Sequence, residues 1–257
     1  MIPPAGEGDA MDIGIIGAGH IGAALARKLA AAGHDVKLAN SRDPDTIRAL
    51  AQELGVAAVT AREAALEAEV LILSVPFGRM PGLAGVVAAA PAGAVVIDTS
   101  NYYPFRDGAI VEVDGGEVET AWAERAIGRP LVKAWNACIM TTLSGKGHPA
   151  GAAGRIALPV AGNDGPTKAV AIELVELTGF DAVDAGSIAE SWRFQPGTPA
   201  YCTELPRDAL VAALAAADRD SAPLNRDEAL RAFLEGSRRF DHDETIARNR
   251  RTSGIGG

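Results

Sequence analysis

The chain has 257 residues, a formal charge of −9, 48% hydrophobic residues and two cysteines, a composition typical of a globular protein with a real core. The acidic balance argues against nucleic acid or an anionic membrane as the main partner, because phosphate binding requires clustered Lys and Arg. No apolar run reaches the roughly 18 residues of a membrane helix, and Cys138 and Cys202 lack the spacing of a zinc site or a disulfide framework. We therefore expect a cytoplasmic protein with no metal site.

Short aliphatic runs alternate with helical patterns over the first half of the chain, which is typical of βαβ units and a parallel sheet. Residues 1–11 are expected to form a flexible leader. The expected strands are Asp12–Ile16, Val36–Ala39, Val56–Val59, Val70–Val75, Ala94–Asp98 and Leu131–Ala134. The expected helices are Ile21–Ala32, a segment from Pro44 to about Leu54 with Asp43 as N-cap, Ala61–Ala68, Pro81–Ala90 and Val118–Ala126.

A second set of elements begins near Gly145. It consists of strands Arg155–Ala161 and Asp181–Ala185, helix Pro166–Thr178, a loop at Arg193–Pro206, and amphipathic helices Asp208–Ala217 and Arg226–Phe240. The pattern predicts a Rossmann-type doubly wound parallel sheet at residues 12–144 and a small, closely packed C-terminal α/β domain with a helical tail at residues 145–257. The basic residues Arg238, Arg239, Arg248, Arg250 and Arg251 are expected at a solvated helix end. The two terminal helices suggest a homodimer surface.

The segment Gly17-Ala18-Gly19-His20-Ile21-Gly22 matches GxGxxG and lies between an expected strand and an expected helix. Gly17 permits the tight turn, Gly19 lets a pyrophosphate approach the backbone, and Gly22 allows close packing of helix on strand. The helix N-terminus offers unpaired N–H groups to the anion. The motif in this context predicts a dinucleotide site.

The end of the second strand reads Asn40-Ser41-Arg42, where an NAD-specific site would carry an acidic residue. A hydroxyl and a guanidinium without a carboxylate favour the 2′-phosphate of NADP. Asp43 leaves NAD open if it turns toward the ribose, although Pro44 after it favours a helix N-cap.

Two polar or turn-forming segments follow later strands. Ser74-Val75-Pro76 and Ser100-Asn101 stand at the carboxyl ends of expected parallel strands, where ligands bind in open sheets. We expect Val75 and Pro76 to pack on cofactor rings, and Ser100 and Asn101 to bond the nicotinamide end. Ordinary turn chemistry is the equally weighted alternative for each residue.

The sequence resembles the F420-dependent NADP oxidoreductase family. The similarity rests on IGIIGAGHIGAALARKLAAAGHDVKLANSR, VLILSVPF, VVIDTSNYYP, LVKAWN, PVAGNDGPTKAV and DAVDAG, between about Asp12 and Leu205. The resemblance implies direct hydride transfer between NADP(H) and a deazaflavin or flavin ring held in the cleft, with no obligatory acid or base. It also implies that Ser41 and Arg42 bind the 2′-phosphate, and that Asn136 and Ala137 line the electron-acceptor side.

The chain departs from the family pattern at His20, after Gly186, and in a tail of about 50 residues. A small imine or carbonyl acceptor is therefore a second hypothesis. An imine or carbonyl would need a proton donor, for which the residues suggest His20, Tyr102, Tyr103, His148 and Tyr201. A non-catalytic NADP(H)-binding sensor is a third hypothesis, because a Rossmann motif does not by itself specify catalysis.

Overall fold

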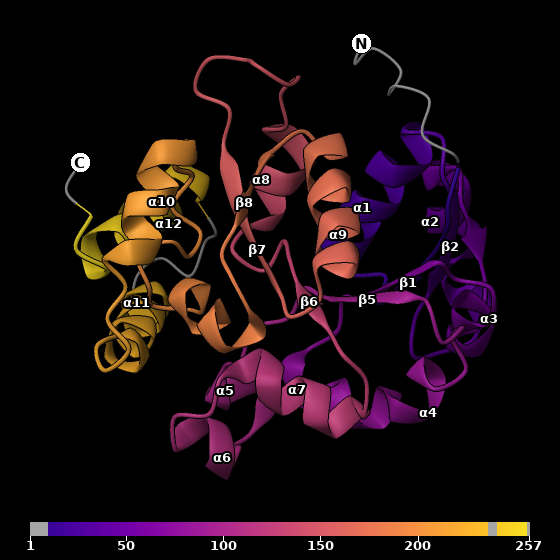
Figure 1. Ribbon diagram of the computed structural model, residues 1–257, viewed down its shortest axis with the longest axis horizontal. Coiled ribbons are helices and arrows are strands. Elements are labelled where there is room, and N and C mark those ends of the chain that lie inside the picture. The colour runs from indigo at the N-terminus through magenta and orange to yellow at the C-terminus, as the bar shows by residue number, and fades with distance from the viewer. Residues whose placement is uncertain (1–9, 236–240, 256–257) are drawn as a thin grey trace.

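The computed structural model describes residues 10–235 and 241–255, which build one eight-stranded sheet with helices on both faces (Figure 1). Its strands are β1 Asp12–Ile16, β2 Asp35–Ala39, β3 Ala57–Ala58, β4 Val70–Leu73, β5 Val95–Asp98, β6 Val132–Lys133, β7 Ala157–Gly162 and β8 Asp181–Asp184. The spatial order β3-β2-β1-β4-β5-β6-β7-β8 contains the Rossmann order 3-2-1-4-5-6. The predicted α/β fold class is thus confirmed.

The strands from β3 to β6 are parallel, as are β7 and β8, but β6 and β7 are antiparallel. The parallel sheet predicted for residues 12–144 is therefore confirmed, and the antiparallel junction lies where the second set of elements joins it. Val132 pairs with Gly162 and Lys133 with Ala161, so the second set of elements extends the same sheet. The predicted boundary near residue 145 stays a prediction, and it would divide a continuous sheet.

Helices cover both faces because the buried strands are apolar on both sides. The helices are α1 His20–Ala31, α2 Arg48–Leu54, α3 Ala61–Leu66, α4 Ala84–Val87, α5 Pro104–Asp107, α6 Val111–Asp114, α7 Glu119–Ile127, α8 Met140–Gly145, α9 Gly165–Leu177, α10 Arg207–Ala215, α11 Ala222–Glu235 and α12 His242–Thr252. Ile13, Val70 and Ile97 face the core under α1 and α9. Leu71 and Val96, on the opposite face, pack under α3, α4 and α7.

Several helical segments differ from the sequence expectation. The segment after Asp43 starts as a 3₁₀ turn at Pro44–Ile47, and a longer 3₁₀ segment at Phe77–Leu83 precedes α4, with Pro81 inside it. Another 3₁₀ segment, Ile188–Phe194, includes the first two residues of the predicted loop Arg193–Pro206. The short helices α5, α6 and α8 were not predicted, because four to six residues show too little periodicity to be recognised.

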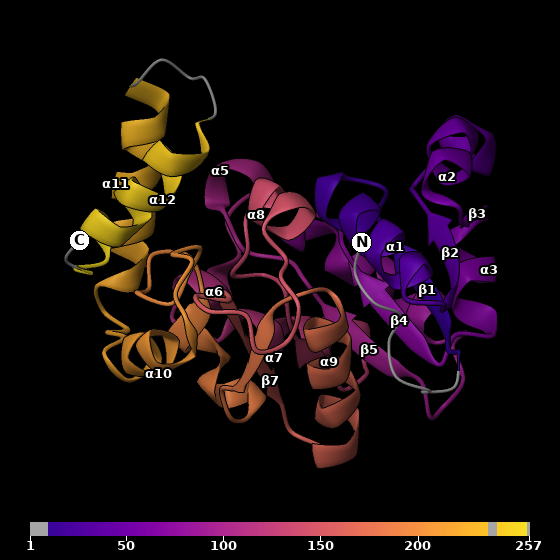
Figure 2. The same cartoon turned by 90° about the horizontal axis from the view of Figure 1, so that it is seen from above.

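The C-terminal helices α11 and α12 stand together at one end of the molecule, beside α10 (Figures 1 and 2). Helix α12 is fixed to the body because Asn249 donates to the carbonyl of Cys202 (3.2 Å) and Arg250 to the carbonyl of Thr203 (2.9 Å). The expectation of a solvated basic end is therefore wrong for Arg250, and also for the half-buried Arg248. Some of the predictions fall on residues that the structure does not describe. These are the predictions for Arg238, Arg239, part of the expected helix Arg226–Phe240 and most of the leader.

Within the described part of the chain, no helix combines the length and the apolar character needed to cross a bilayer. Cys138 and Cys202 are both buried free thiols.

Candidate functional site

A cleft of about 730 Å³ opens at the carboxyl ends of β1, β2 and β4, where the strand order changes direction. It brings together eight of the predicted cofactor-binding residues: Gly17, Gly19, Asn40, Ser41, Arg42, Ser74, Val75 and Pro76. Its lining does not include the other predicted ones, which are His20, Ile21, Gly22, Ser100, Asn101, Asn136 and Ala137. The glycine loop and the specificity segment thus share one concave surface.

The three motif glycines meet different spatial demands. Gly17 has a φ of +118°, and a Cβ there would lie 2.0 Å from the carbonyl oxygen of Ser74. A Cβ on Gly22 would lie 1.8 Å from the carbonyl oxygen of Gly17, so helix α1 packs on the turn itself. A Cβ on Gly19 would meet no heavy atom within 4 Å among the described residues. The approach to the start of α1 is open at Gly19 alone of these three positions.

The N-terminus of α1 is suited to an anion. Gly19 is its N-cap, no side chain caps the helix, and the first turn carries no acidic residue. The first N–H groups of such a helix have no partner within it and carry a partial positive charge. The open space at Gly19 therefore fits a pyrophosphate bound by backbone N–H groups.

The specificity segment is shaped by Asn40. Its side chain donates to Thr46 Oγ1 (2.9 Å) and accepts from the backbone N–H of Arg42 (2.8 Å), so Asn40 fixes the turn. Asp43 accepts from the N–H of Asp45 (2.9 Å) and is the predicted helical N-cap. Arg42 lies exposed at the cleft, and no ion pair of the described residues engages its guanidinium. This arrangement leaves a positive charge where a 2′-phosphate would bind.

Arg79 is a second cation of the cleft that sequence reasoning missed. It lies exposed in the 3₁₀ segment after Pro76, whose carbonyl accepts from its backbone N–H (2.9 Å). The sequence did contain a signal for this role, since Arg79 is a basic residue that closely follows the carboxyl end of β4. The cleft lining carries two arginines and no carboxylate, which suits a ligand with several phosphates.

Ser100 is held by a buried ion pair. Lys133 Nζ lies 2.7 Å from Asp98 Oδ2, and both side chains are fully buried. Ser100 donates its hydroxyl to Asp98 Oδ1 (2.6 Å), while Lys133 also donates to the Ser100 carbonyl. This network joins the ends of β5 and β6. The hydroxyl of Ser100 is therefore occupied by the fold, and its predicted contact with nicotinamide stays a prediction.

Asn101 and Asn136 connect the loops that follow β5 and β6. Asn136 Nδ2 donates to Asn101 Oδ1 (3.1 Å) and to the carbonyl of Phe194 (3.0 Å), and Asn101 Nδ2 donates to the carbonyl of Asn136 (2.9 Å). Asn136 Oδ1 is buried and has no partner in residues 10–235 and 241–255. A buried acceptor without a donor is costly, so a ligand N–H group would be stabilised there. Ala137 is buried beside it, and its carbonyl accepts from the N–H of Cys202.

The predicted proton donors fall into different surroundings. Tyr102 is buried, and its hydroxyl donates to Asp114 (2.9 Å) and accepts from the N–H of Ile110 (3.0 Å), outside the cleft. His20, the first residue of α1, and His148 are exposed. None of these three residues lines the cleft in the described structure.

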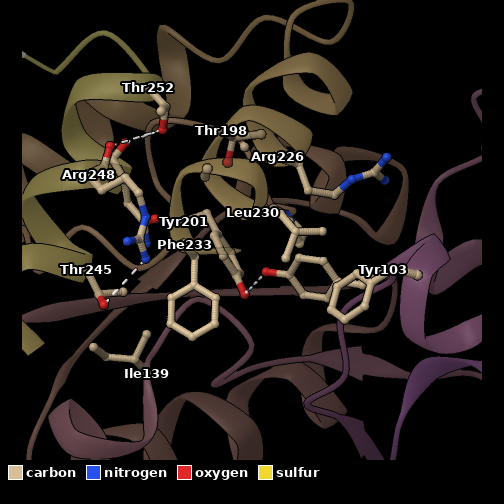
Figure 3. Close-up of a pocket in the computed structure, with 15 residues that line it drawn as sticks. Tyr103, Ile139, Thr198, Tyr201, Arg226, Leu230, Phe233, Thr245, Arg248 and Thr252 are labelled. Carbon is tan, nitrogen blue, oxygen red and sulfur yellow. Dashed lines mark hydrogen bonds between the residues drawn. The ribbon is translucent and has the colours of Figure 1, made fainter. Parts of the chain in front are cut away.

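Tyr103 and Tyr201 form a pair, with 2.9 Å between their hydroxyl oxygens. Burial raises the pKa of both phenols well above the ordinary value, so both stay protonated at neutral pH. The pair borders a second cavity, of about 200 Å³, between the body and helices α11 and α12 (Figure 3). Tyr103 shortly follows Asn101, and Ile139, another lining residue, shortly follows Asn136. The cavity therefore lies beyond β5 and β6, along the same carboxyl edge as the cleft.

Residues 12–102 match the model of the family described as NADP oxidoreductase, coenzyme F420-dependent. The protein YjhV of Escherichia coli K12 is 36% identical over 102 residues, which are 40% of this chain and 74% of YjhV.

Two solved structures share the fold. Protein SMa0349 of Sinorhizobium meliloti is 31% identical and superposes with a TM-score of 0.67 over 78% of this chain and 97% of its own. A candidate F420-dependent NADP reductase of Arthrobacter sp. FB24 is 24% identical, with a TM-score of 0.60 over 71% and 87%.

The glycine loop and the cation-lined cleft indicate a dinucleotide site, and the family match indicates an enzyme rather than a non-catalytic sensor. The chain belongs to the F420-dependent NADP oxidoreductase family and is an NAD(P)-dependent oxidoreductase.

Proposed function

We propose that the protein transfers a hydride between NADP(H) and an acceptor bound at the carboxyl edge of β5 and β6. The observation that carries this proposal is that one cleft contains both the open N-terminus of α1 and two arginines, with no carboxylate among the described residues that line it. NADPH supplies the hydride when bound. The chain itself binds phosphates with backbone N–H groups and with Arg42, and it orients the two partners.

The buried acceptor Asn136 Oδ1 supports this orientation. A carboxamide N–H₂ donor, such as that of nicotinamide, would satisfy it and would place the ring beside the loops after β5 and β6. The exposed Pro76 and half-buried Val75 would then pack along the cofactor, as the sequence suggested.

Coenzyme F420 or a flavin is the first candidate acceptor, because the matching family is described by that coenzyme. A planar ring needs proximity and orientation more than a dedicated acid. A small carbonyl or imine is the second candidate, and one observation favours it: a hydroxyl pair of high pKa stands beside the cavity beyond β5 and β6.

The test of cofactor use compares NADPH and NADH in fluorescence titrations of the wild type, Arg42→Ala and Arg48→Ala. Arg48 is the matched control, since it is an exposed arginine that pairs with Asp45 and does not line the cleft. We expect Arg42→Ala to weaken NADPH about tenfold or more and NADH little, because a charge-assisted phosphate contact contributes roughly 1.5–3 kcal/mol. Equal losses for both dinucleotides would refute the 2′-phosphate assignment.

The test of acceptor use measures NADPH oxidation with F420, FMN, FAD and a panel of carbonyls and imines. The absence of turnover with every acceptor would refute hydride transfer. The cytoplasmic location stays a prediction. The homodimer also stays one. Sedimentation velocity at micromolar concentration would test it.

A further inference from the structure

The cavity under α11 and α12 has the size and lining of a small-molecule site. It measures about 200 Å³, which is smaller than the roughly 300–1,000 Å³ of sites for drug-sized ligands. Ile139, Leu230 and Phe233 supply much of its apolar wall, and the tyrosine pair borders one side (Figure 3). An occupant would therefore be small and largely apolar.

The guanidinium of Arg248, in the wall of this cavity, has too few hydrogen-bond partners within the described structure. Arg248 Nε is buried and has no hydrogen-bond partner in the described residues. The guanidinium reaches Thr245 Oγ1 only at 3.5 Å and lies 5.6 Å from the centre of the Phe233 ring. No carboxylate lines the cavity, although the whole chain carries an excess of nine negative charges. A partly buried guanidinium without a counterion is complemented best by an anionic group of the occupant.

The second arginine of the lining is engaged elsewhere. Arg226 pairs with Asp227 at 2.8 Å and lies 5.8 Å from the ring of Tyr102. Figure 3 shows its guanidinium pointing away from Phe233 and Arg248. The unsatisfied positive charge is therefore that of Arg248, and one anionic group would complement it.

We propose that this cavity binds the hydride acceptor, and that the acceptor is a small carbonyl or imine compound with an apolar body and one carboxylate. Arg248 binds the carboxylate. The reducible group lies at the Tyr103–Tyr201 pair. This inference rests on the proposed function and specifies its second candidate acceptor.

The reduction requires a hydride from NADPH and a proton from the tyrosine pair. The acceptor carbon gains a hydride, with two electrons, from NADPH, which leaves as NADP⁺. The electron pair of the C=O or C=N bond moves to the heteroatom, which takes a proton from a phenol of the pair. Within the tyrosine pair, one hydroxyl donates its hydrogen bond to the oxygen of the other. The second hydroxyl is therefore free to donate a proton to the acceptor. Water then returns the proton to the phenolate.

The first arm of the test uses 4-methyl-2-oxopentanoate and its methyl ester as probes on the full chain, with binding measured by calorimetry in the presence of NADP⁺. In the wild type we expect the acid to bind at least about tenfold more tightly than the ester. Arg248→Met should abolish this difference and leave NADPH affinity unchanged, and Arg248→Lys should keep part of it. Arg251→Met is the matched control, since Arg251 is an exposed arginine of the same helix outside the cavity lining.

The second arm compares the Tyr201→Phe variant with the wild type in NADPH-dependent turnover of the acid. We expect kcat to fall about 100-fold or more while KM and NADPH affinity change little, because removal of a proton donor slows the chemical step. A purely structural role of Tyr201 would instead raise KM or lower thermal stability.

The outcomes separate this inference from the proposed function. Equal affinity for acid and ester in the wild type, or an equal loss of both in Arg248→Met, would overturn the inference. Reduction of F420 or flavin with no reduction of any carboxylate-bearing carbonyl or imine would also overturn it, while the proposed function would stand. Failure to bind NADPH would overturn both.

Discussion

At the scale of single residues, an alanine substitution at one position of the glycine loop should lower stability, and at another it should weaken cofactor binding. A Cβ on Gly22 would overlap the carbonyl of Gly17, whereas a Cβ on Gly19 enters open space at an ordinary φ of −77°. We expect Gly22→Ala to lower the free energy of unfolding by about 1–3 kcal/mol, because the added methyl group overpacks the turn. Gly19→Ala should fold normally and bind NADPH about tenfold or more weakly, because its methyl blocks the pyrophosphate.

Differential scanning fluorimetry and NADPH titration of both variants provide the two readouts. Normal NADPH affinity in Gly19→Ala would place the pyrophosphate elsewhere.

Glu119 should make stability depend on pH. This side chain is buried, it accepts from the N–H of Tyr102 (3.0 Å), and burial raises its pKa to about 7. Because this pKa exceeds that of the unfolded chain, the folded protein holds the proton more tightly. Stability from this group is therefore full at low pH and is lost as pH rises from about 5 to 8, by about 2–3 kcal/mol.

The Glu119→Gln variant stays neutral and should show a flatter stability profile in urea unfolding across this pH range. Glu53→Gln, at an exposed ion pair with Arg27, is the control. A wild-type slope that persists in Glu119→Gln would assign the pH dependence to other groups.

The sequence could predict the residues whose role depends on local backbone, but not those whose role depends on distant partners. Gly17, Asp43 and Arg42 were predictable because a turn, a cap and a strand end are defined by neighbours in the chain. Lys133 and Arg248 were not, because their significance comes from Asp98 and from the cavity lining, which lie far away in sequence.

At the scale of elements, Arg155 joins three segments and should be important for stability. Its guanidinium lies 2.7 Å from Asp181 at the start of β8, pairs with Glu176 of α9, and donates to the carbonyl of His148 (3.0 Å). Only 4% of Arg155 is exposed. We expect Arg155→Ala to lower the free energy of unfolding by about 3–5 kcal/mol, because it removes the buried counterion of two partly buried carboxylates and leaves them only the more exposed and more distant Arg207.

Urea denaturation measures this loss. Arg27→Ala is the matched control: its ion pair with Glu53 is exposed, and its removal should cost at most about 1 kcal/mol. Similar losses in the two variants would show that Arg155 does not hold these elements together.

The predictability of elements depended on length and amphipathic pattern. The long helices α1 and α9 and the apolar strands β1 and β4 were predicted to within about two residues, since each has a clear periodicity. The antiparallel pairing of β7 with β6 was not predictable. Both strands lie in short, mostly apolar runs, and such a run does not indicate whether its neighbour is parallel or antiparallel. Helix α12 was not predicted, because its sequence is strongly polar and contains few apolar residues. Its position is fixed instead by hydrogen bonds to the backbone carbonyls of Cys202 and Thr203.

At the scale of the whole molecule, both predicted domains contribute to one core. Leu25 and Leu29 of α1 belong to the same buried cluster as Val175 and Phe180. Trp135 Nε1 donates to Thr178 Oγ1 (3.1 Å), and Lys28 lies 5.8 Å from the centre of the Phe180 ring. A boundary near residue 145 would expose this shared surface, so the two parts are expected to unfold together.

We therefore expect a single calorimetric unfolding transition, which NADPH raises as a whole although its cleft is built from residues of the first 83 positions. At about 100 times the dissociation constant, NADPH should add about 2.7 kcal/mol, a rise in Tm of roughly 5–11 °C for a chain of this size. In Arg42→Ala the same NADPH concentration should give a smaller rise. Two transitions, of which NADPH moves only one, would contradict the shared core and support independent domains.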